Sequence, residues 1–328
     1  MHLTLDSYVF VALLAPCLLL TACDQKNVPV QSTAMSNPVV TEKSKVPPCH
    51  DISECRKLAE QGNAQAQYDL GVMYDNGDGI AQDDTQATLW YRKAAEQGYA
   101  PAQYYFGKTF ESAPLDSERD DAQAAFWYRK AAEQGLVDAQ YDLAEIYENG
   151  VSTVQDYKQA VFWYHKAAEK GHADAQYNLG NMYEEGKGTD KDNTQAAFWY
   201  GKAAEQGSVS AQYRLGAMYE KGTGVTQDYN QALSLFRKAA DHDNSDAQYN
   251  LGVMYEYGKG VTQDYAQAVA WYRKAEKGNI NAQYRLGLMY LNGHGVNQDN
   301  AQAISLFRSA AEVGNADARK KLDEMKAQ

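Results

Sequence analysis

Most of the chain alternates hydrophobic and polar positions with the period of an amphipathic α-helix, in two recurring registers. In the first register, apolar side chains fall at i, i+4, i+7 and i+8, as at Ala66, Leu70, Met73 and Tyr74. In the second they fall at i, i+3, i+4, i+7 and i+8, as within residues 87–95. Either pattern places the apolar side chains along one face of a helix. The sequence therefore predicts pairs of amphipathic helices.

The helix pairs recur with a fixed period. The triplet Ala-Gln-Tyr returns in steps of 36, 37, 36, 36, 36 and 35 residues, ending at Tyr68, Tyr104, Tyr141, Tyr177, Tyr213, Tyr249 and Tyr284. A second phrase, first written WYRKAAEQG, follows each triplet and aligns Trp90, Trp127, Trp163, Trp199, Leu235, Trp271 and Leu306. One helix pair cannot bury its aromatic face alone, whereas a neighbouring pair can cover it, so such units stack. We therefore expect an all-α solenoid of seven helix-turn-helix repeats over 64–314, with capping helices over 49–63 and 315–328.

Glycine and aspartate mark the ends of these predicted helices. Gly77 and Gly79 follow the first helix of the first repeat, and glycine adopts the left-handed conformation favoured after a helix C-terminus without strain. Each second helix follows an aspartate with glutamine three residues later, a capping box in which each side chain can bond a free backbone N–H. These aspartates are Asp83, Asp120, Asp156, Asp192, Asp228, Asp264 and Asp299. The second and third repeats lack a complete glycine pair, so their inter-helix turns should differ.

The residues that recur carry a family resemblance. The pattern A-x-x-x-L-G-x-x-Y-x-x-G-x-G-V, an acidic cap and then W-Y-x-K-A-A-E-x-G resembles the Sel-like repeat, a relative of the tetratricopeptide repeat, over 64–314. This resemblance implies right-handed superhelical stacking of the helix pairs. It also implies a scaffold or adaptor role through protein or peptide binding, without naming a partner.

Residues 1–22 are typical of a bacterial lipoprotein signal peptide. The apolar run YVFVALLAPCLLL is too short for a membrane span and has the length of a signal-peptide core. The following Leu-Thr-Ala-Cys resembles the lipobox, which implies cleavage before Cys23 and lipidation of that residue. The segment before the run has no Lys or Arg and contains Asp6, so an ordinary cleaved or uncleaved leader is the alternative. Lipid on Cys23 would anchor the protein to a membrane.

The segment 23–48 connects this anchor to the repeats. It is rich in Pro, Ser, Thr, Val and Lys and has no apolar periodicity, which predicts a flexible tether. Asp24, directly after the cysteine, resembles a signal that retains lipoproteins at the inner membrane. We therefore expect the periplasmic side of the bacterial cell envelope, with the inner membrane favoured over the outer.

Two further cysteines lie near the start of the first predicted helix. If Asp51 caps that helix, Cys49 lies two residues outside it and Cys55 lies in its first turn, which makes a disulfide feasible in an oxidising compartment. Two free thiols are the alternative. Metal binding by Cys49, His50 and Cys55 is disfavoured because no further cluster of ligands is evident.

Charge and motif content exclude several classes of function. The formal net charge of −12 disfavours binding to nucleic acid or to anionic lipid surfaces. No serine has a lysine three residues later, and neither Ser-Asp-Asn nor Lys-Thr-Gly occurs, so the penicillin-recognising signature is absent. We expect no catalysis, no cofactor, no metal and no small-molecule substrate.

If the function is binding, the candidate residues are those that vary on the first helices away from the Leu-Met-Tyr core. Positions spaced i, i+3 and i+7 along each first helix form such a stripe, and by analogy with tetratricopeptide domains these helices line a concave groove. The third and fourth repeats contribute acids and amides, the later ones basic and apolar groups. The predicted groove residues are Asp69, Tyr105, Asp142, Asn178, Asn181, Arg214, Lys221, Asn250, Tyr257, Arg285 and Asn292.

Three functions remain open at this point. The first is a membrane-tethered periplasmic adaptor, in which asparagines hold an extended peptide and Arg214, Lys221 and Arg285 take a carboxylate. The second is an assembly or regulatory factor for exported polysaccharide or cell-wall machinery, which the resemblance to lipidated solenoids implies. The third is a hydrolase of a β-lactam or peptidoglycan.

Overall fold

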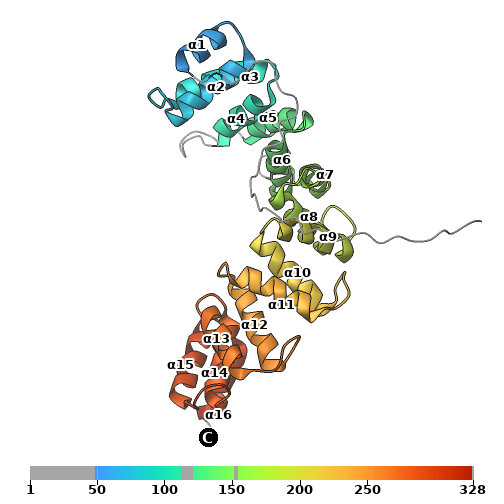
Figure 1. Cartoon of the computed structure of the whole chain (residues 1–328), viewed down its shortest axis with the longest axis vertical. Coiled ribbons are helices and arrows are strands. Elements are labelled where there is room, and N and C mark those ends of the chain that lie inside the picture. The colour runs from blue at the N-terminus through green and yellow to red at the C-terminus, as the bar shows by residue number, and fades with distance from the viewer. Residues whose placement is uncertain (1–48, 50, 112–120, 151–153, 327–328) are drawn as a thin grey trace, which may run out of the picture. The chain divides into compact units, whose positions relative to one another are not determined.

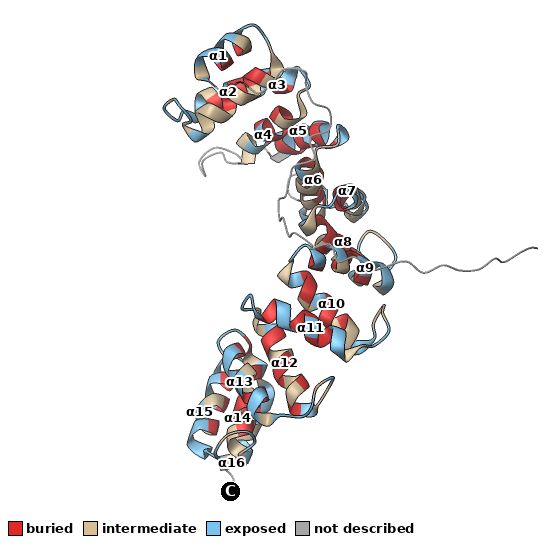
Figure 2. Ribbon diagram, in the orientation of Figure 1, coloured by how far each residue is buried: buried red, intermediate tan, exposed pale blue. Residues whose placement is uncertain are grey.

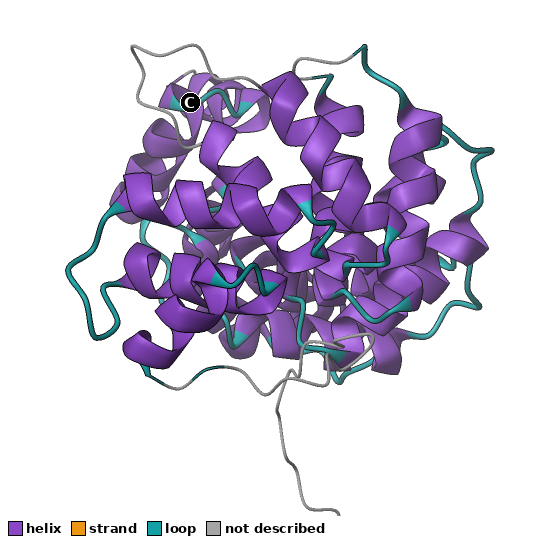
Figure 3. Cartoon of the chain, turned by 90° about the horizontal axis from the view of Figure 1, so that it is seen from above, coloured by secondary structure: helices purple, strands orange, loops and turns teal. Residues whose placement is uncertain are grey.

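The chain forms consecutive antiparallel helix pairs, as the periodicity predicts. The computed structural model describes residues 49, 51–111, 121–150 and 154–326 (Figure 1). The predicted signal peptide, the tether and Cys23 lie outside these residues. Within the described ranges there are sixteen α-helices and no strand (Figure 3), and no helix among them is long and apolar enough to cross a membrane.

Each repeat supplies one pair, flanked by a single helix at either end. The first helix is α1 (Ile52–Glu60) and the last is α16 (Ala316–Lys326). The pairs between them are α2 (Ala64–Asn76) with α3 (Asp84–Glu96), α4 (Ala100–Glu111) with α5 (Asp121–Glu133), α6 (Val137–Asn149) with α7 (Tyr157–Glu169), α8 (Ala173–Glu185) with α9 (Asn193–Glu205), α10 (Val209–Lys221) with α11 (Tyr229–Ala240), α12 (Ser245–Tyr257) with α13 (Tyr265–Ala275), and α14 (Ile280–Asn292) with α15 (Asn300–Glu312).

The core is distributed along the stack rather than collected at one centre. Every helix packs against the next one in chain order, so each second helix lies between its own partner and the following repeat. The buried residues form successive clusters, from one that joins Cys55 of α1 to Leu70 and Trp90 to one that joins Phe307 to Ala318 of α16. Figure 2 shows buried faces along the whole series of helices. This is the packing of a solenoid.

The glycine of the repeated Leu-Gly phrase lets the two helices of a pair approach closely. A Cβ atom on Gly71 would lie 2.7 Å from ring carbons of the fully buried Tyr91, and one on Gly180 would lie 2.6 Å from the ring of Tyr200. Both distances are below van der Waals contact, so a larger residue requires the ring or the helices to shift. The third repeat makes this adjustment, because it has Ala144 at this position while its Tyr164 is still fully buried. The phrase recurs because of this packing.

The capping prediction is confirmed for the aspartates and corrected for the glutamines. Asp83 accepts a hydrogen bond from the backbone N–H of Gln86 at 3.0 Å. Its own N–H donates to the carbonyl of Tyr74, on the first helix of the same repeat, at 3.0 Å. The backbone N–H of Asp83, which the capping box would pair with the side chain of Gln86, is thus bonded to α2 instead. This bond forms because the turn brings Asp83 back beside the C-terminal end of α2. Asp120 and the turns of the second and third repeats fall largely on 112–120 and 151–153, outside the described residues.

Candidate binding surface

The predicted groove residues all lie on first helices, where they form two columns. We call the residues at the sixth position of each repeat the inner column: Asp69, Tyr105, Asp142, Asn178, Arg214, Asn250 and Arg285. The outer column, at the thirteenth position, contains Lys221, Tyr257 and Asn292, and all three are exposed. Asn181 lies between the columns. Together they are the first-helix stripe.

The inner column contacts the preceding repeat. Asp142 of α6 accepts a hydrogen bond from the hydroxyl of Tyr104, on α4, at 2.8 Å. Asn178 of α8 donates to the hydroxyl of Tyr164, on α7, at 3.2 Å. Asp142 and Asn178 of the inner column therefore join neighbouring repeats, because the sixth position faces the repeat before it.

Two arginines of the stripe already have carboxylate partners within the chain. A guanidinium nitrogen of Arg285 lies 3.3 Å from Oε1 of Glu256, and one of Arg214 lies 3.9 Å from Oε2 of Glu184. Burial disfavours the charge of Arg285, but Glu256 and the hydroxyl of Tyr257 raise its pKa above the usual arginine value. The expectation that Arg214 and Arg285 await a partner's carboxylate is corrected accordingly. Lys221 remains an exposed cation of the outer column.

Behind the inner column lies a set of buried tyrosine–carboxylate pairs that the sequence reasoning missed. The hydroxyl of Tyr164 donates to Glu148 at 2.6 Å, and that of Tyr200 lies 2.6 Å from Glu184. At the equivalent positions of the first and sixth repeats, the hydroxyl of Tyr91 donates to Asp75 and that of Tyr272 donates to Glu256. Burial and the adjacent carboxylate raise the pKa of each of these tyrosines. These pairs hold the two helices of a repeat together beneath the stripe.

The sequence did contain a signal for these pairs. In the seventh repeat the tyrosine is replaced by Phe307 and the acid by Leu291, so both polar partners disappear together. In the fifth repeat Phe236 replaces the tyrosine but Glu220 remains, and Lys259 of the next repeat pairs with it at 2.9 Å. Comparing the repeats with one another at these two positions would have found the interaction.

Several other stripe residues are also held by tyrosines. Oδ1 of Asn181 lies 2.7 Å from the Tyr200 hydroxyl. Arg285 donates to the hydroxyl of Tyr257 at 2.7 Å, which links the inner and outer columns. Tyr105 packs against Tyr68, with ring centroids 5.6 Å apart, and is 36% exposed. Tyrosine side chains therefore hold several residues of the stripe in place.

Two carboxyl groups of the inner column have altered acidity. Burial raises the pKa of Asp142 to about 6, although the Tyr104 hydroxyl and Lys108 oppose the shift. Burial also raises the pKa of Asp69, and the backbone N–H of Cys49 partly offsets it. Asp142 can therefore change charge near neutral pH, at the joint between the second and third repeats.

The N-terminal cap carries a disulfide. Cys49 and Cys55 are bonded, with Cα atoms 5.3 Å apart, and Cys55 is fully buried beneath α2. Asp51 caps α1 by accepting the N–H of Ser53 at 2.7 Å. Across the described residues, no three His, Cys, Asp or Glu side chains gather in a way that would hold a metal ion.

Comparison with known proteins agrees with the repeat assignment. A family profile described as Sel1 repeat matches 64–99, 100–136, 137–172, 173–208, 209–244, 245–279 and 280–315. No curated protein matches the chain.

Two solved structures share more than a third of their aligned residues with the chain. The first is c5321, a protective antigen present in uropathogenic Escherichia coli strains that displays an SLR fold. It is 38% identical with a TM-score of 0.75, over 84% of this chain and 59% of c5321. This chain thus spans less than two thirds of that relative. The second is a Sel1 repeat protein from Oxalobacter formigenes, 37% identical with a TM-score of 0.61, over 84% of this chain and 80% of that one.

Proposed function

The chain belongs to the Sel1 repeat family, and from this premise we propose that it is a membrane-tethered periplasmic adaptor that binds a protein or peptide segment along the first-helix stripe. Scaffolds built from this repeat typically serve protein–protein interaction and are generally not catalytic. The observation that carries the proposal is the network beneath the stripe. Because Asp142, Asn178 and Arg285 are held by the preceding repeat, these side chains keep a fixed arrangement, which lowers the entropy lost on binding.

The outer column defines the chemistry of the proposed partner. Lys221 offers a charge to a carboxylate, Tyr257 offers a ring that is 53% exposed, and Asn292 offers an amide to a peptide backbone. Arg214 and Arg285 support this surface rather than supply its free charges, since Glu184 and Glu256 already pair with them. An extended segment with a carboxylate and an apolar side chain fits these groups.

The proposed anchor is lipid on Cys23. The lipobox-like Leu-Thr-Ala-Cys supports it, and 25 residues separate Cys23 from Cys49, enough to hold the repeats away from the membrane. We propose the periplasmic side of the envelope, with the inner membrane favoured by Asp24.

Crosslinking mass spectrometry on intact envelopes tests the adaptor role. The wild-type chain is compared with a variant carrying Lys221→Glu, Tyr257→Ala and Asn292→Ala, three exposed positions. The change at Tyr257 removes one hydrogen bond of Arg285, which keeps its partner Glu256. We expect a protein crosslinked to α10, α12 or α14 in the wild type and lost in the variant.

A matched control changes three exposed positions on second helices, Lys158→Glu, Gln267→Ala and Gln302→Ala. It should retain the crosslink. Equal crosslinking of the stripe variant and the wild type would reject the stripe as the binding surface.

The anchor has its own test. A Cys23→Ser variant should lose incorporation of an alkyne-bearing fatty acid and move from the membrane fraction to the soluble fraction, whereas a Cys17→Ser variant should behave as the wild type. Retention of the label by Cys23→Ser would reject lipidation at this residue. Density-gradient separation of inner and outer membranes then decides between the two locations.

One observation favours the second candidate, a factor for assembly of exported polysaccharide. A cleft of about 820 Å³ between α3 and α4 is lined by Tyr91, Tyr105, Asp75, Asp84 and Thr88. Aromatic rings beside carboxylates and hydroxyls suit a sugar ring, which has apolar faces and polar edges. Calorimetry with the purified exported polysaccharide tests this reading. Binding lost in Tyr105→Ala and kept in Tyr257→Ala would support it, and no binding by the wild type would reject it.

A further inference from the structure

The second helices depart from their own pattern at one junction, between the fourth and fifth repeats. At the position after the Trp-Tyr pair, α9 has Gly201. The other six second helices have arginine or histidine at this position: Arg92, Arg129, His165, Arg237, Arg273 and Arg308. On the following second helix, α11, Leu235 stands in the tryptophan column. Both changes remove side-chain volume, and only here do the two coincide on neighbouring second helices.

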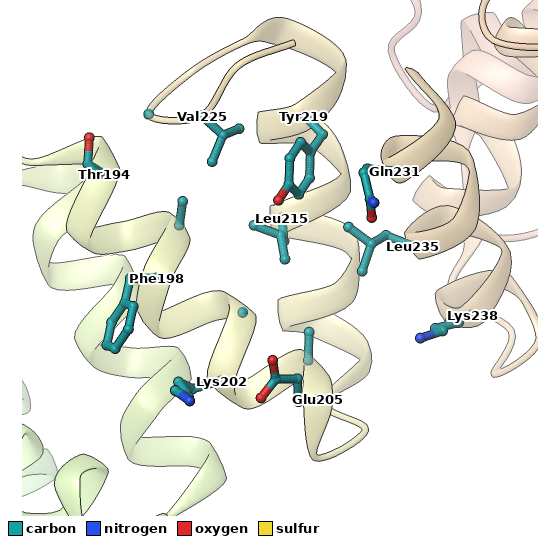
Figure 4. A pocket seen from close by; sticks show the side chains of 14 residues that line it. Thr194, Phe198, Lys202, Glu205, Leu215, Tyr219, Val225, Gln231, Leu235 and Lys238 are labelled. Atoms are coloured by element: carbon teal, nitrogen blue, oxygen red, sulfur yellow. The ribbon is translucent and has the colours of Figure 1, made fainter. Parts of the chain in front are cut away.

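These two departures open a cleft between α9, α10 and α11, which we call the α9–α11 cleft. Its volume is about 550 Å³, and its apolar lining comes from Phe198, Leu215, Tyr219, Val225 and Leu235. A Cβ atom on Gly201 would meet only Leu215, at 4.0 Å, so the space above this glycine is open. Figure 4 shows Leu215 and Tyr219 on the middle helix, between Phe198 on one side and Leu235 on the other. The cleft is large enough for a large side chain of another protein.

The cleft lies at the end of a row of exposed apolar side chains. The same position of successive second helices holds Leu89, Phe126, Phe162 and Phe198, each between 42% and 52% exposed. Beyond the cleft that position holds Ser234, Ala270 and Ser305. Each phenylalanine packs edge-on against the adjacent tryptophan, as Phe198 does on Trp199 with centroids 5.0 Å apart. An exposed apolar row that stops at a cleft is typical of an interaction surface.

The charges around the cleft indicate the kind of partner. Lys202 and Lys238 line it together with one acid, Glu205, although the whole chain has a net charge of −12. Lys202 also lies 5.8 Å from the Phe198 ring centroid. The rim is thus locally basic and the floor apolar, which favours an acidic segment carrying a large apolar side chain.

We propose that the α9–α11 cleft is a second docking site, which receives an aliphatic or aromatic side chain from an acidic segment of a partner protein. The segment lies across Lys202 and Lys238, and its flanking side chains contact Phe198. This site is separate from the first-helix stripe, since none of the cleft residues belongs to that stripe. The two surfaces allow one chain to hold two segments at once, which is what an adaptor must do.

Selection from a phage-displayed library of random short peptides tests the proposal, with the immobilised full chain as bait. Enriched peptides are then labelled, and their affinity is measured by fluorescence anisotropy. We expect enriched peptides with Leu, Phe, Met or Trp beside Asp or Glu. Their affinity should fall about tenfold or more for Gly201→Arg and for Leu235→Trp, because either change fills the cleft.

Both substitutions restore a residue that other repeats of the chain carry at that position, so the fold accommodates them. Gly201→Arg should raise the midpoint of thermal unfolding, since glycine in a helix interior is unfavourable. Gln195→Arg adds the same side chain to an exposed position of α9 outside the cleft and should leave affinity unchanged. The double variant Lys202→Glu with Lys238→Glu should weaken binding of the acidic peptides.

Several results would overturn the proposal, among them no peptide enriched on the wild type, enriched peptides that bind Gly201→Arg as tightly as the wild type, or an enriched set that is basic. The stripe variant Lys221→Glu, Tyr257→Ala, Asn292→Ala should bind the cleft peptides normally. If it does not, the two surfaces are one site and the separate cleft is rejected.

Discussion

A Cβ atom on Gly224 would overlap the backbone carbonyl oxygen of Asn193, the first residue of α9 in the preceding repeat. The second glycine of the pair therefore serves two purposes in this repeat. It adopts a left-handed conformation, with φ of 71°, and it lets the turn lie directly on the neighbouring helix. Gly79 in the first repeat has nearly the same backbone conformation, with φ of 72°, but nothing lies within 4 Å of it.

Replacing these two glycines by alanine should separate backbone strain from inter-repeat packing. Gly79→Ala should lower the free energy of unfolding by about 1–2 kcal/mol, the cost of a left-handed alanine. Gly224→Ala adds a clash with backbone and should cost about 2–4 kcal/mol. Urea unfolding of both variants measures the difference. Equal losses would show that the contact with Asn193 contributes nothing.

Asp243 should be replaceable by glycine with a gain in stability. It is the one residue other than glycine with positive φ in the described part of the chain, at 59°. It occupies the position at which most other repeats have the glycine that follows their second helix. Asp243→Gly should raise the free energy of unfolding by about 0.5–1 kcal/mol, because glycine has no strain there. Asp241→Gly, two residues earlier at φ −65°, should instead destabilise by a similar amount. A loss of stability in Asp243→Gly, measured by urea unfolding, would contradict this account.

The buried pair of Tyr164 and Glu148 should behave as one unit in a double-mutant cycle. Tyr164→Phe leaves the carboxylate without its donor and should cost about 1.5–3 kcal/mol. Adding Glu148→Leu reproduces Phe307 and Leu291 of the seventh repeat, so the double variant should lose less than the sum of the single losses, by about 1 kcal/mol. Chemical denaturation of the four proteins gives the coupling. Strict additivity would mean that the 2.6 Å contact carries no energy.

Asp142 should make stability depend on pH between about 4 and 6. Its folded pKa of about 6 lies above 3.8, the ordinary value for an aspartate, so the folded state binds the proton more tightly than the unfolded state. Stability therefore falls as pH rises through this window. Asp142→Asn keeps an acceptor for Tyr104 but does not titrate, so its stability relative to the wild type should increase from pH 4 to pH 6. Parallel stability profiles of the two proteins, from urea unfolding at several pH values, would contradict the raised pKa.

The candidate site was only partly accessible to sequence reasoning. The spacing along each first helix placed Lys221, Tyr257 and Asn292 correctly on an exposed column. It could not show that Arg214 and Arg285 are paired, because Glu184 and Glu256 lie about 30 residues earlier in the preceding repeat. Periodicity describes one face of one helix, and the contact between two repeats depends on how their faces meet.

By itself the sequence determined the repeat length, the helix pairs, the aspartate caps and the capping helices, since these depend on local periodicity and backbone preference. Only the tertiary structure decided which polar groups are engaged and where a cleft opens. Gly201 and Leu235 are unremarkable changes when each is taken alone, and they form a cavity because stacking brings residues 34 positions apart to the same surface. The physical reason is that such a surface in a solenoid is formed by residues of two neighbouring repeats, and the sequence pattern within one repeat does not contain both sets of residues.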